Sequence, residues 1–149
     1  MYTNILIATD GSELAQKGVE HGLALARLCG AKVTVLTVSE PFPTFDLVSK
    51  LGFFQDPEVV ARYAADCKTL ADETLTRAQA AAEAAGVSCE TLYVADSAPA
   101  AGILEAAKFR GSDLIVVASH GRRGLERMVI GSQATKVLTQ ATVPVLVVR

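Results

Sequence analysis

The stretch Ile-Leu-Ile-Ala-Thr-Asp-Gly-Ser, residues 5–12, holds an apolar run, a break and a helix start in immediate succession. Ile5–Ala8 is short, apolar and partly β-branched, which predicts a buried strand. Ser12 is a good N-cap, and the pattern after it predicts a helix to about Cys29. Gly30 fits the C′ position that ends a helix. These residues therefore predict a strand followed at once by a helix.

The same succession of strand and helix recurs along the rest of the chain. Further strands are predicted at Val33–Val38, Cys89–Val94, Leu114–Ala118 and Val143–Val148. Helices are predicted from Asp56-Pro57 to Gly86, over Pro99–Phe109 and over Gly131–Gln140. Alternating strands and helices indicate a parallel sheet with right-handed crossovers and helices on both faces. No linker or internal repeat divides the chain, so we expect a single α/β domain over residues 1–149.

Composition places the chain among ordinary globular domains. Half of its 149 residues are apolar, a fifth are charged, and the net charge is −2. This balance argues against a protein that binds nucleic acid or a membrane surface. The three cysteines, Cys29, Cys67 and Cys89, share no metal-ligand spacing and are predicted to be packing residues in a reducing compartment. No signal peptide is predicted at the start, and the apolar runs are too short to cross a bilayer, so we expect a cytoplasmic protein.

The segment from Ala118 to Ser132 has the composition of a phosphate-binding loop. It follows a predicted strand, and ligands of parallel sheets collect at the carboxyl ends of the strands. Gly131-Ser132 opens a helix, whose N–H groups and positive dipole end favour an anion. Three arginines add positive charge: Arg122, Arg123 and Arg127. The alternative is that the glycines serve only a turn and the arginines are solvated.

Asp10 and His120 each allow two interpretations. Asp10 follows the first strand and could bind a sugar or a metal, or only support the helix start at Ser12. His120 could act as a general base, but the only nucleophile beside it in the sequence is Ser119. We therefore favour a ligand role for Asp10 and a structural hydrogen bond for His120.

The break at Ser39–Gln55 holds Phe42, Phe45, Phe53 and Phe54. These aromatic residues could form a satellite hydrophobic cluster over the end of the sheet. They could also form a lid over a ligand or a surface for a partner, because long loops in compact domains are often functional.

Four stretches make the chain resemble the universal stress protein family. They are the start at Ile5–Ser12, the Ser-His-Gly of residues 119–121, the Gly131-Ser132 pair and the terminal Val143–Val148. The similarity covers nearly the whole chain. It implies a Rossmann-like, five-stranded parallel sheet of order 3-2-1-4-5. It also implies a homodimer, in which the fifth strand pairs with that of a second subunit and so covers an apolar edge.

The ATP-binding branch of that family carries a glycine, two residues, a second glycine, nine residues, and then glycine with Ser or Thr. Here Gly121 is the second glycine, Arg122–Ile130 are the nine residues, and Gly131-Ser132 completes the pattern. Ala118 stands where the first glycine is expected. Alanine needs no positive φ at the end of a strand, so we expect a mild effect.

The resemblance also implies roles for individual residues. Asp10 would lie near the ribose and adenine, and Ala8 and Val38 would line the adenine pocket. The phosphates would be held by Gly121, Arg122, Gly131, Ser132 and Gln133, with Mg²⁺ bridging them and Asp10 as a further contact of the metal. Thr9, Ala118 and His120 complete the predicted site.

The function implied is that of an ATP-binding regulator of the stress response, acting as a dimeric sensor or switch. We expect slow hydrolysis at most, because the sequence shows no acid–base constellation for an attacking water. One alternative is a family member that does not bind ATP, or that binds a cyclic nucleotide, and acts through dimerisation. The other is a weak ATPase or nucleotidyl-transfer enzyme. A receiver-like switch fits less well, because Thr9 precedes Asp10 where a second acid would stand.

Overall fold

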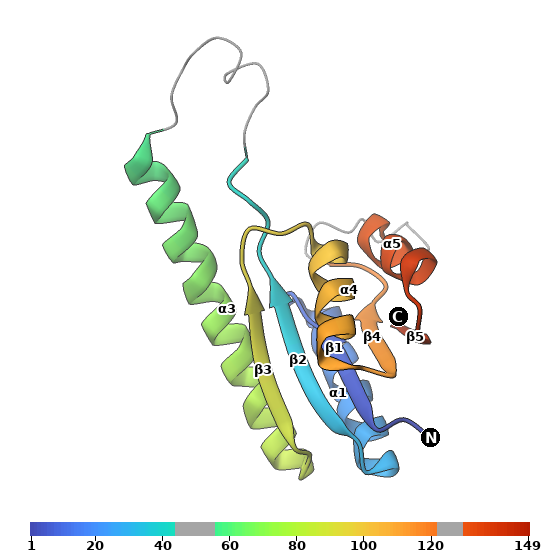
Figure 1. The fold of residues 1–149 in the computed structure, drawn as a ribbon. Helices are drawn as coiled ribbons and strands as arrows, with labels where there is room; N and C mark the ends of the chain where they lie inside the picture. The colour runs from blue at the N-terminus through green and yellow to red at the C-terminus, as the bar shows by residue number, and fades with distance from the viewer. Residues whose placement is uncertain (44–55, 122–129) are drawn as a thin grey trace.

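The computed structural model describes residues 1–43, 56–121 and 130–149. The order of its elements is β1 (Asn4–Ala8), α1 (Glu13–Cys29), β2 (Lys32–Val38), α3 (Pro57–Ala85), β3 (Cys89–Val94), α4 (Pro99–Arg110), β4 (Leu114–Ala118), α5 (Ser132–Gln140) and β5 (Val145–Val148). The five strands form one parallel sheet in the order β3-β2-β1-β4-β5 (Figure 1). The predicted α/β class and strand order are confirmed.

The helix ends follow the capping residues that the sequence displays. Ser12 accepts a hydrogen bond from Ala15 N–H at the start of α1, and Asp56 accepts one from Glu58 N–H at the start of α3. Gly30 and Gly86 end these helices in the left-handed region, with φ of 68° and 67°.

Five predicted boundaries were wrong by one or two residues. Strands β1 and β2 each begin one residue earlier than predicted, and α4 ends one residue later, at Arg110. Helix α5 begins at Ser132, and Gly131 is its extended N-cap. Strand β5 begins at Val145, two residues later than predicted. Pro144 has no N–H, and its carbonyl accepts the hydrogen bond from Ile115 N–H at 3.0 Å, so the regular ladder starts only after it.

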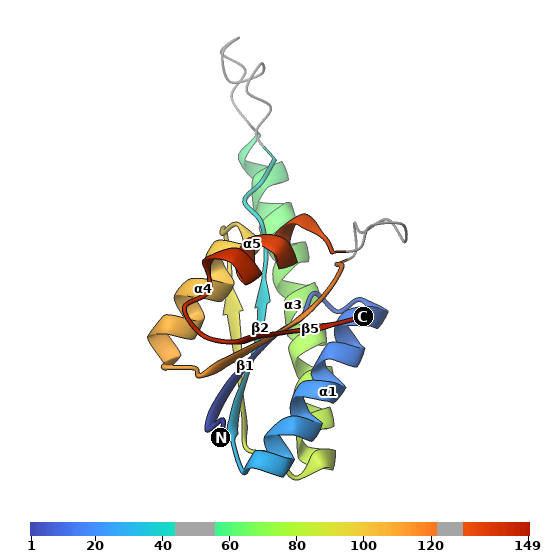
Figure 2. The same cartoon turned by 90° about the vertical axis from the view of Figure 1, so that its right-hand side faces the viewer.

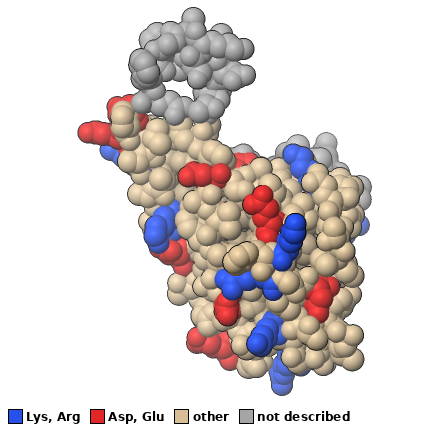
Figure 3. Space-filling model, in the orientation of Figure 1, with Lys and Arg blue, Asp and Glu red and all other residues tan. Residues whose placement is uncertain are grey.

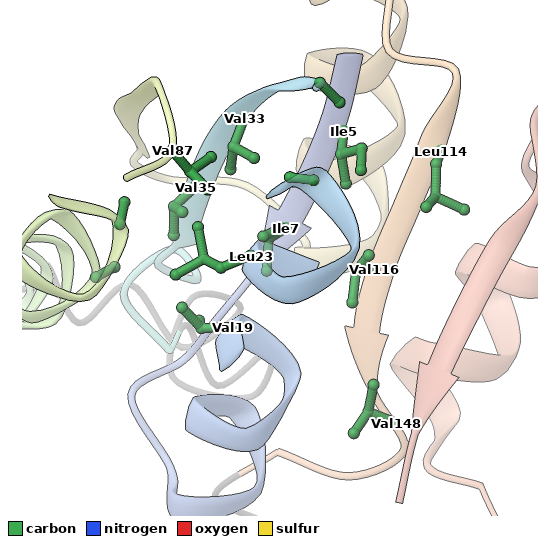
Figure 4. Close-up of a cluster of buried hydrophobic side chains, with 14 of the residues drawn as sticks. Ile5, Ile7, Val19, Leu23, Val33, Val35, Val87, Leu114, Val116 and Val148 are labelled. Carbon is green, nitrogen blue, oxygen red and sulfur yellow. The ribbon is translucent and has the colours of Figure 1, made fainter. Parts of the chain in front are cut away.

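Helices cover both faces of the sheet, as the apolar strands predict (Figure 2). On one face, α1 and α3 pack against side chains such as Ile7, Val35 and Val116, and Figure 4 shows this cluster. On the other face, α4 and α5 pack against Leu6, Leu36 and Ile115. The small residues Gly18, Gly22 and Ala26 are buried on α1, which confirms close packing of that helix on the sheet.

Hydrogen bonds to the Asp113 carboxylate join the starts of β1 and β4 at the amino end of the sheet. The Asp113 carboxylate accepts bonds from the N–H and hydroxyl of Thr3, both at 2.7 Å, and from Asn4 N–H at 3.0 Å. Burial raises the pKa of Asp113, but these bonds outweigh it and hold the pKa below its usual value. The carboxylate therefore stays ionised at neutral pH and holds β1 beside β4.

The surface carries charges of both signs. Figure 3 shows Lys and Arg side chains interspersed with Asp and Glu side chains on the face in view. Within residues 1–43, 56–121 and 130–149, no helix is long and apolar enough to span a membrane. All three cysteines are free and half-buried, as expected of packing residues.

Most of the Phe-rich segment lies outside the described residues, because residues 44–55 are not among them. Phe42 is described, and its ring meets that of Tyr63 edge-on at 5.3 Å between centroids. Tyr63 also donates a hydrogen bond to the Glu40 carbonyl at 3.0 Å. These two contacts hold the start of the segment against α3. The choice between a satellite cluster, a lid and a partner surface stays a prediction.

Candidate functional site

A cavity of about 470 Å³ lies at the carboxyl end of the sheet, which is the upper end of β2 and β3 in Figure 1. This volume is within the usual range for a small-molecule site. Ten of the eleven predicted site residues line it: Ala8, Thr9, Asp10, Val38, Ala118, His120, Gly121, Gly131, Ser132 and Gln133. The eleventh, Arg122, lies outside the described residues, as do Arg123 and Arg127.

The turn after β1 and the loop after β4 meet at Asp10 and Gly121. One Asp10 oxygen, Oδ1, accepts a hydrogen bond from Ser12 N–H at 3.0 Å, so the carboxylate does support the helix start. The other oxygen, Oδ2, would lie 2.7 Å from a Cβ atom at position 121. Glycine at 121 therefore lets the chain after β4 pass directly beside this carboxylate.

Helix α5 presents its first turn to the cavity without a side-chain cap. Gly131 is its N-cap, with extended φ and ψ of −70° and 158°, and within the described residues the helix has no side-chain cap. Gly131 N–H itself donates to the Ser119 carbonyl at 2.7 Å, which ties the start of α5 to the end of β4. A helix N-terminus held open in this way favours an anionic ligand.

His120 is bound to its neighbour Ser119. The Ser119 hydroxyl and His120 Nδ1 lie 2.9 Å apart, and Ser119 is only 1% exposed. A hydroxyl this deeply buried is poorly placed to attack a substrate. This bond is of the kind that a structural role for His120 requires, and that role stays a prediction.

Gln133 makes a contact that the sequence did not predict. Its Oε1 accepts a hydrogen bond from Ala100 N–H, in the first turn of α4, at 3.1 Å. The side chain thus lines the cavity and also joins two helices.

The walls on the α3 and α4 side contain further residues missed from the sequence. From α3 they include Tyr63, Cys67, Leu70 and Thr74, and from α4 and the strands Pro99, Ile103, Leu36 and Val117. The helical spacing of the α3 residues was visible, but it indicates only a packed face. Nothing local distinguishes a residue packed on the core from one that faces a cavity.

The described residues hold no cluster of three or more His, Cys, Asp or Glu side chains that could bind a metal ion.

Comparison with known proteins agrees with this architecture. Residues 1–149 match the model of the Universal stress protein family. The chain belongs to this family. It is 35% identical over 150 residues to Universal stress protein YxiE of Bacillus subtilis, with the full length of both chains covered. It is 32% identical to Universal stress protein MJ0531 of Methanocaldococcus jannaschii, covering 100% of this chain and 83% of that protein.

Solved structures of similar chains share the fold. The structure of MJ0577 superposes with a TM-score of 0.81 at 26% identity, covering 99% of this chain and 96% of that one. A universal stress protein in complex with cAMP has a TM-score of 0.72 at 23% identity, covering 99% and 97% of the two chains. The Archaeoglobus fulgidus protein in complex with dAMP has a TM-score of 0.69 at 23% identity, covering 99% and 98%. An Arabidopsis thaliana family member with AMP bound has a TM-score of 0.67 at 20% identity, covering 97% and 90%.

Proposed function

We propose that this universal stress protein binds an adenine nucleotide, ATP with Mg²⁺, in the cavity at the carboxyl end of its sheet. The observation that carries the proposal is the first turn of α5, which has a glycine N-cap and lines the same cavity as Asp10 and Gly121. Solved relatives with cAMP, dAMP and AMP support an adenine nucleotide as the class of ligand. The protein then acts as a regulator whose state depends on the bound nucleotide.

The phosphates fit the α5 end of the cavity. The N–H groups of Ser132 and Gln133 and the hydroxyl of Ser132 supply donors, and the helix dipole adds partial positive charge. Mg²⁺ would be held by the phosphate oxygens, with Asp10 as the nearby carboxylate.

The base fits beside Val38. Pairing of β1 with β2 ends where Thr9 N–H donates to the Leu36 carbonyl at 2.8 Å, and beyond it β1 turns away. The backbone groups of Ser39 point to the β3 side of β2. There the Ser39 N–H donates to the Val94 carbonyl, and the Ser39 carbonyl accepts from Ser97 N–H. Because backbone groups alternate sides along a strand, those of Val38 face the cavity. Adenine presents a donor and an acceptor that match such a strand edge.

Ala118 is compatible with this arrangement. Side chains alternate along β4, so Ala118 shares the face of Leu114 and Val116, which is covered by α1. Helix α5 lies on the opposite face. The methyl group therefore lies away from the phosphate end.

Hydrolysis is expected to be slow. Among the described residues, Asp10 and His120 line this end of the cavity, and they bond to Ser12 N–H and Ser119 respectively. We assign neither of them the role of general base for an attacking water. We therefore propose that the protein acts in the cytoplasm by binding its nucleotide, with slow hydrolysis at most.

We also propose a homodimer through β5. This strand pairs only with β4 in the described part of the chain, and Leu146 on it is 37% exposed. An apolar edge strand of this kind favours pairing with a second copy. Sedimentation equilibrium at micromolar concentration should give twice the 15.6 kDa chain mass, and the mass of a single chain would contradict the dimer.

Calorimetric titration of the purified protein tests the nucleotide proposal directly. ATP with Mg²⁺ should bind at micromolar concentration, and AMP and cAMP more weakly, because they place fewer phosphate charges at α5. GTP is the control for the base, since its edge does not match that of adenine. Mass spectrometry of ligand released from the protein gives an independent readout. Absence of binding to all three adenine nucleotides would contradict the proposal.

A further inference from the structure

Helix α4 has no N-terminal cap of its own. Its N-cap residue is Ala98, whose side chain makes no hydrogen bond, and Pro99 follows at the first helical position. The next N–H, that of Ala100, is one of the groups left without a partner inside any helix. In this structure its partner comes from α5, because Gln133 Oε1 accepts from Ala100 N–H at 3.1 Å.

The two helices that share this bond both begin at the cavity. Pro99 of α4 and Ser132 of α5 line it together, and Figure 2 shows the helices next to each other on one side of the sheet. Their contact is apolar and buried, through Ala100 and Ile103 of α4 and Ala134 and Val137 of α5. To this apolar packing the hydrogen bond adds a directional constraint between the two helices.

The first turn of α5 is therefore held at two points. The bond from Gly131 N–H to the Ser119 carbonyl connects it to β4, and Gln133 connects it to α4. Only the second bond uses a side chain. Gly131 itself leaves the N–H groups of this turn open to a ligand, and within the described residues these two bonds help to set their direction.

We propose that Gln133 is a positioning residue, which holds the anion-binding turn of α5 in place by capping α4 with its side chain. This inference rests on the proposed nucleotide site and adds which side chain holds the first turn of α5 in its orientation. Gln133 contributes its backbone N–H to the phosphates, while its side chain acts through Ala100. An uncharged amide suits this place, because it caps α4 without adding a negative charge beside the phosphates.

The test compares Gln133→Ala with a variant that restores the cap of α4 from within α4. Loss of the bond should lower the Tm of the ligand-free protein by about 2–5 °C. It should weaken ATP binding about tenfold and leave adenosine binding within about twofold, because only the phosphates depend on the α5 turn. Gln140→Ala, at the exposed last residue of α5, is the matched control and should change neither quantity.

Adding Ala98→Ser to Gln133→Ala separates positioning from stability. Residue 98 is exposed and extended, with φ and ψ of −63° and 133°, so serine can act there as an N-cap. We expect the Tm to return toward that of the wild type while ATP binding stays weak. Recovery of ATP binding together with the Tm would overturn the positioning role.

Two further results would also overturn it. An unchanged Tm of ligand-free Gln133→Ala would show that the side chain does not hold α4, and that a loss of ATP affinity arises from direct contact. Equal losses for ATP and adenosine would show a general effect on the cavity. Failure of the proposed function is distinguishable, because the wild-type protein would then bind neither ligand, while the Tm values still report on the bond to Ala100.

Discussion

Gly131→Asp should weaken ATP binding by about 100-fold or more, because it places a carboxylate at the start of α5, where the phosphates are expected. Like charges at close range cost several kcal/mol of binding free energy. Helix α5 should remain intact, since Gly131 has extended φ and ψ and aspartate is a favourable N-cap. Isothermal titration calorimetry with ATP and Mg²⁺ measures the loss.

Gly131→Asn provides the matched control for this result. Asparagine has nearly the shape of aspartate and caps helices equally well, but it carries no charge. Both variants add a Cβ atom, which would lie 3.1 Å from the Ser119 carbonyl oxygen and requires the same small shift. The asparagine variant should bind ATP at least tenfold more tightly than the aspartate variant. Equal affinities in two folded variants would contradict the assignment of the phosphates to α5.

Gly22→Val should lower the free energy of unfolding by about 3 kcal/mol, because α1 packs on the sheet through this position. A Cβ atom there would lie 2.9 Å from Ile7 Cγ1 and 3.6 Å from Val116 Cγ2, before any γ-carbon is added. Ile7 and Val116 are both fully buried, so their side chains have little space to yield. Urea unfolding followed by circular dichroism measures the change.

Glu20→Val serves as the control on the same helix. Glu20 is exposed, so valine there changes helix propensity but meets no packed neighbour. We expect a loss below about 1 kcal/mol. A Gly22→Val variant as stable as the Glu20→Val variant would show that α1 lies farther from β1 than the structure places it.

Local signals in the sequence were sufficient for the elements of this fold. Ser12 and Asp56 start helices through bonds to N–H groups two or three residues away, and Gly30 and Gly86 end them. Because the strands are apolar on both faces, the sheet needs a layer of helices on each face. The alternation of strands and helices along the chain supplies these two layers. The boundary errors were small, as with Pro144, whose missing N–H delays the ladder of β5.

The strand order followed from the family resemblance and not from the residues. A parallel crossover can return to either side of a strand with the same local pattern, so the pattern alone leaves the order open. The order β3-β2-β1-β4-β5 places β1 beside β4 and so brings the turn at Asp10 next to the loop at Gly121. The motif residues indicated both segments but not their contact.

The sequence by itself thus determined a parallel α/β domain, the caps of α1 and α3, and the glycine and serine residues of the proposed anion site. Only the tertiary structure decided which groups surround that site. Asp10 meets Gly121 across the β1–β4 pair, Gln133 caps a helix that begins 34 residues before it, and α3 supplies a wall. Caps and apolar periodicity act over a few neighbouring residues and are therefore visible in the sequence. Contacts between distant segments depend on how the helices pack on the sheet, and no single segment encodes that packing.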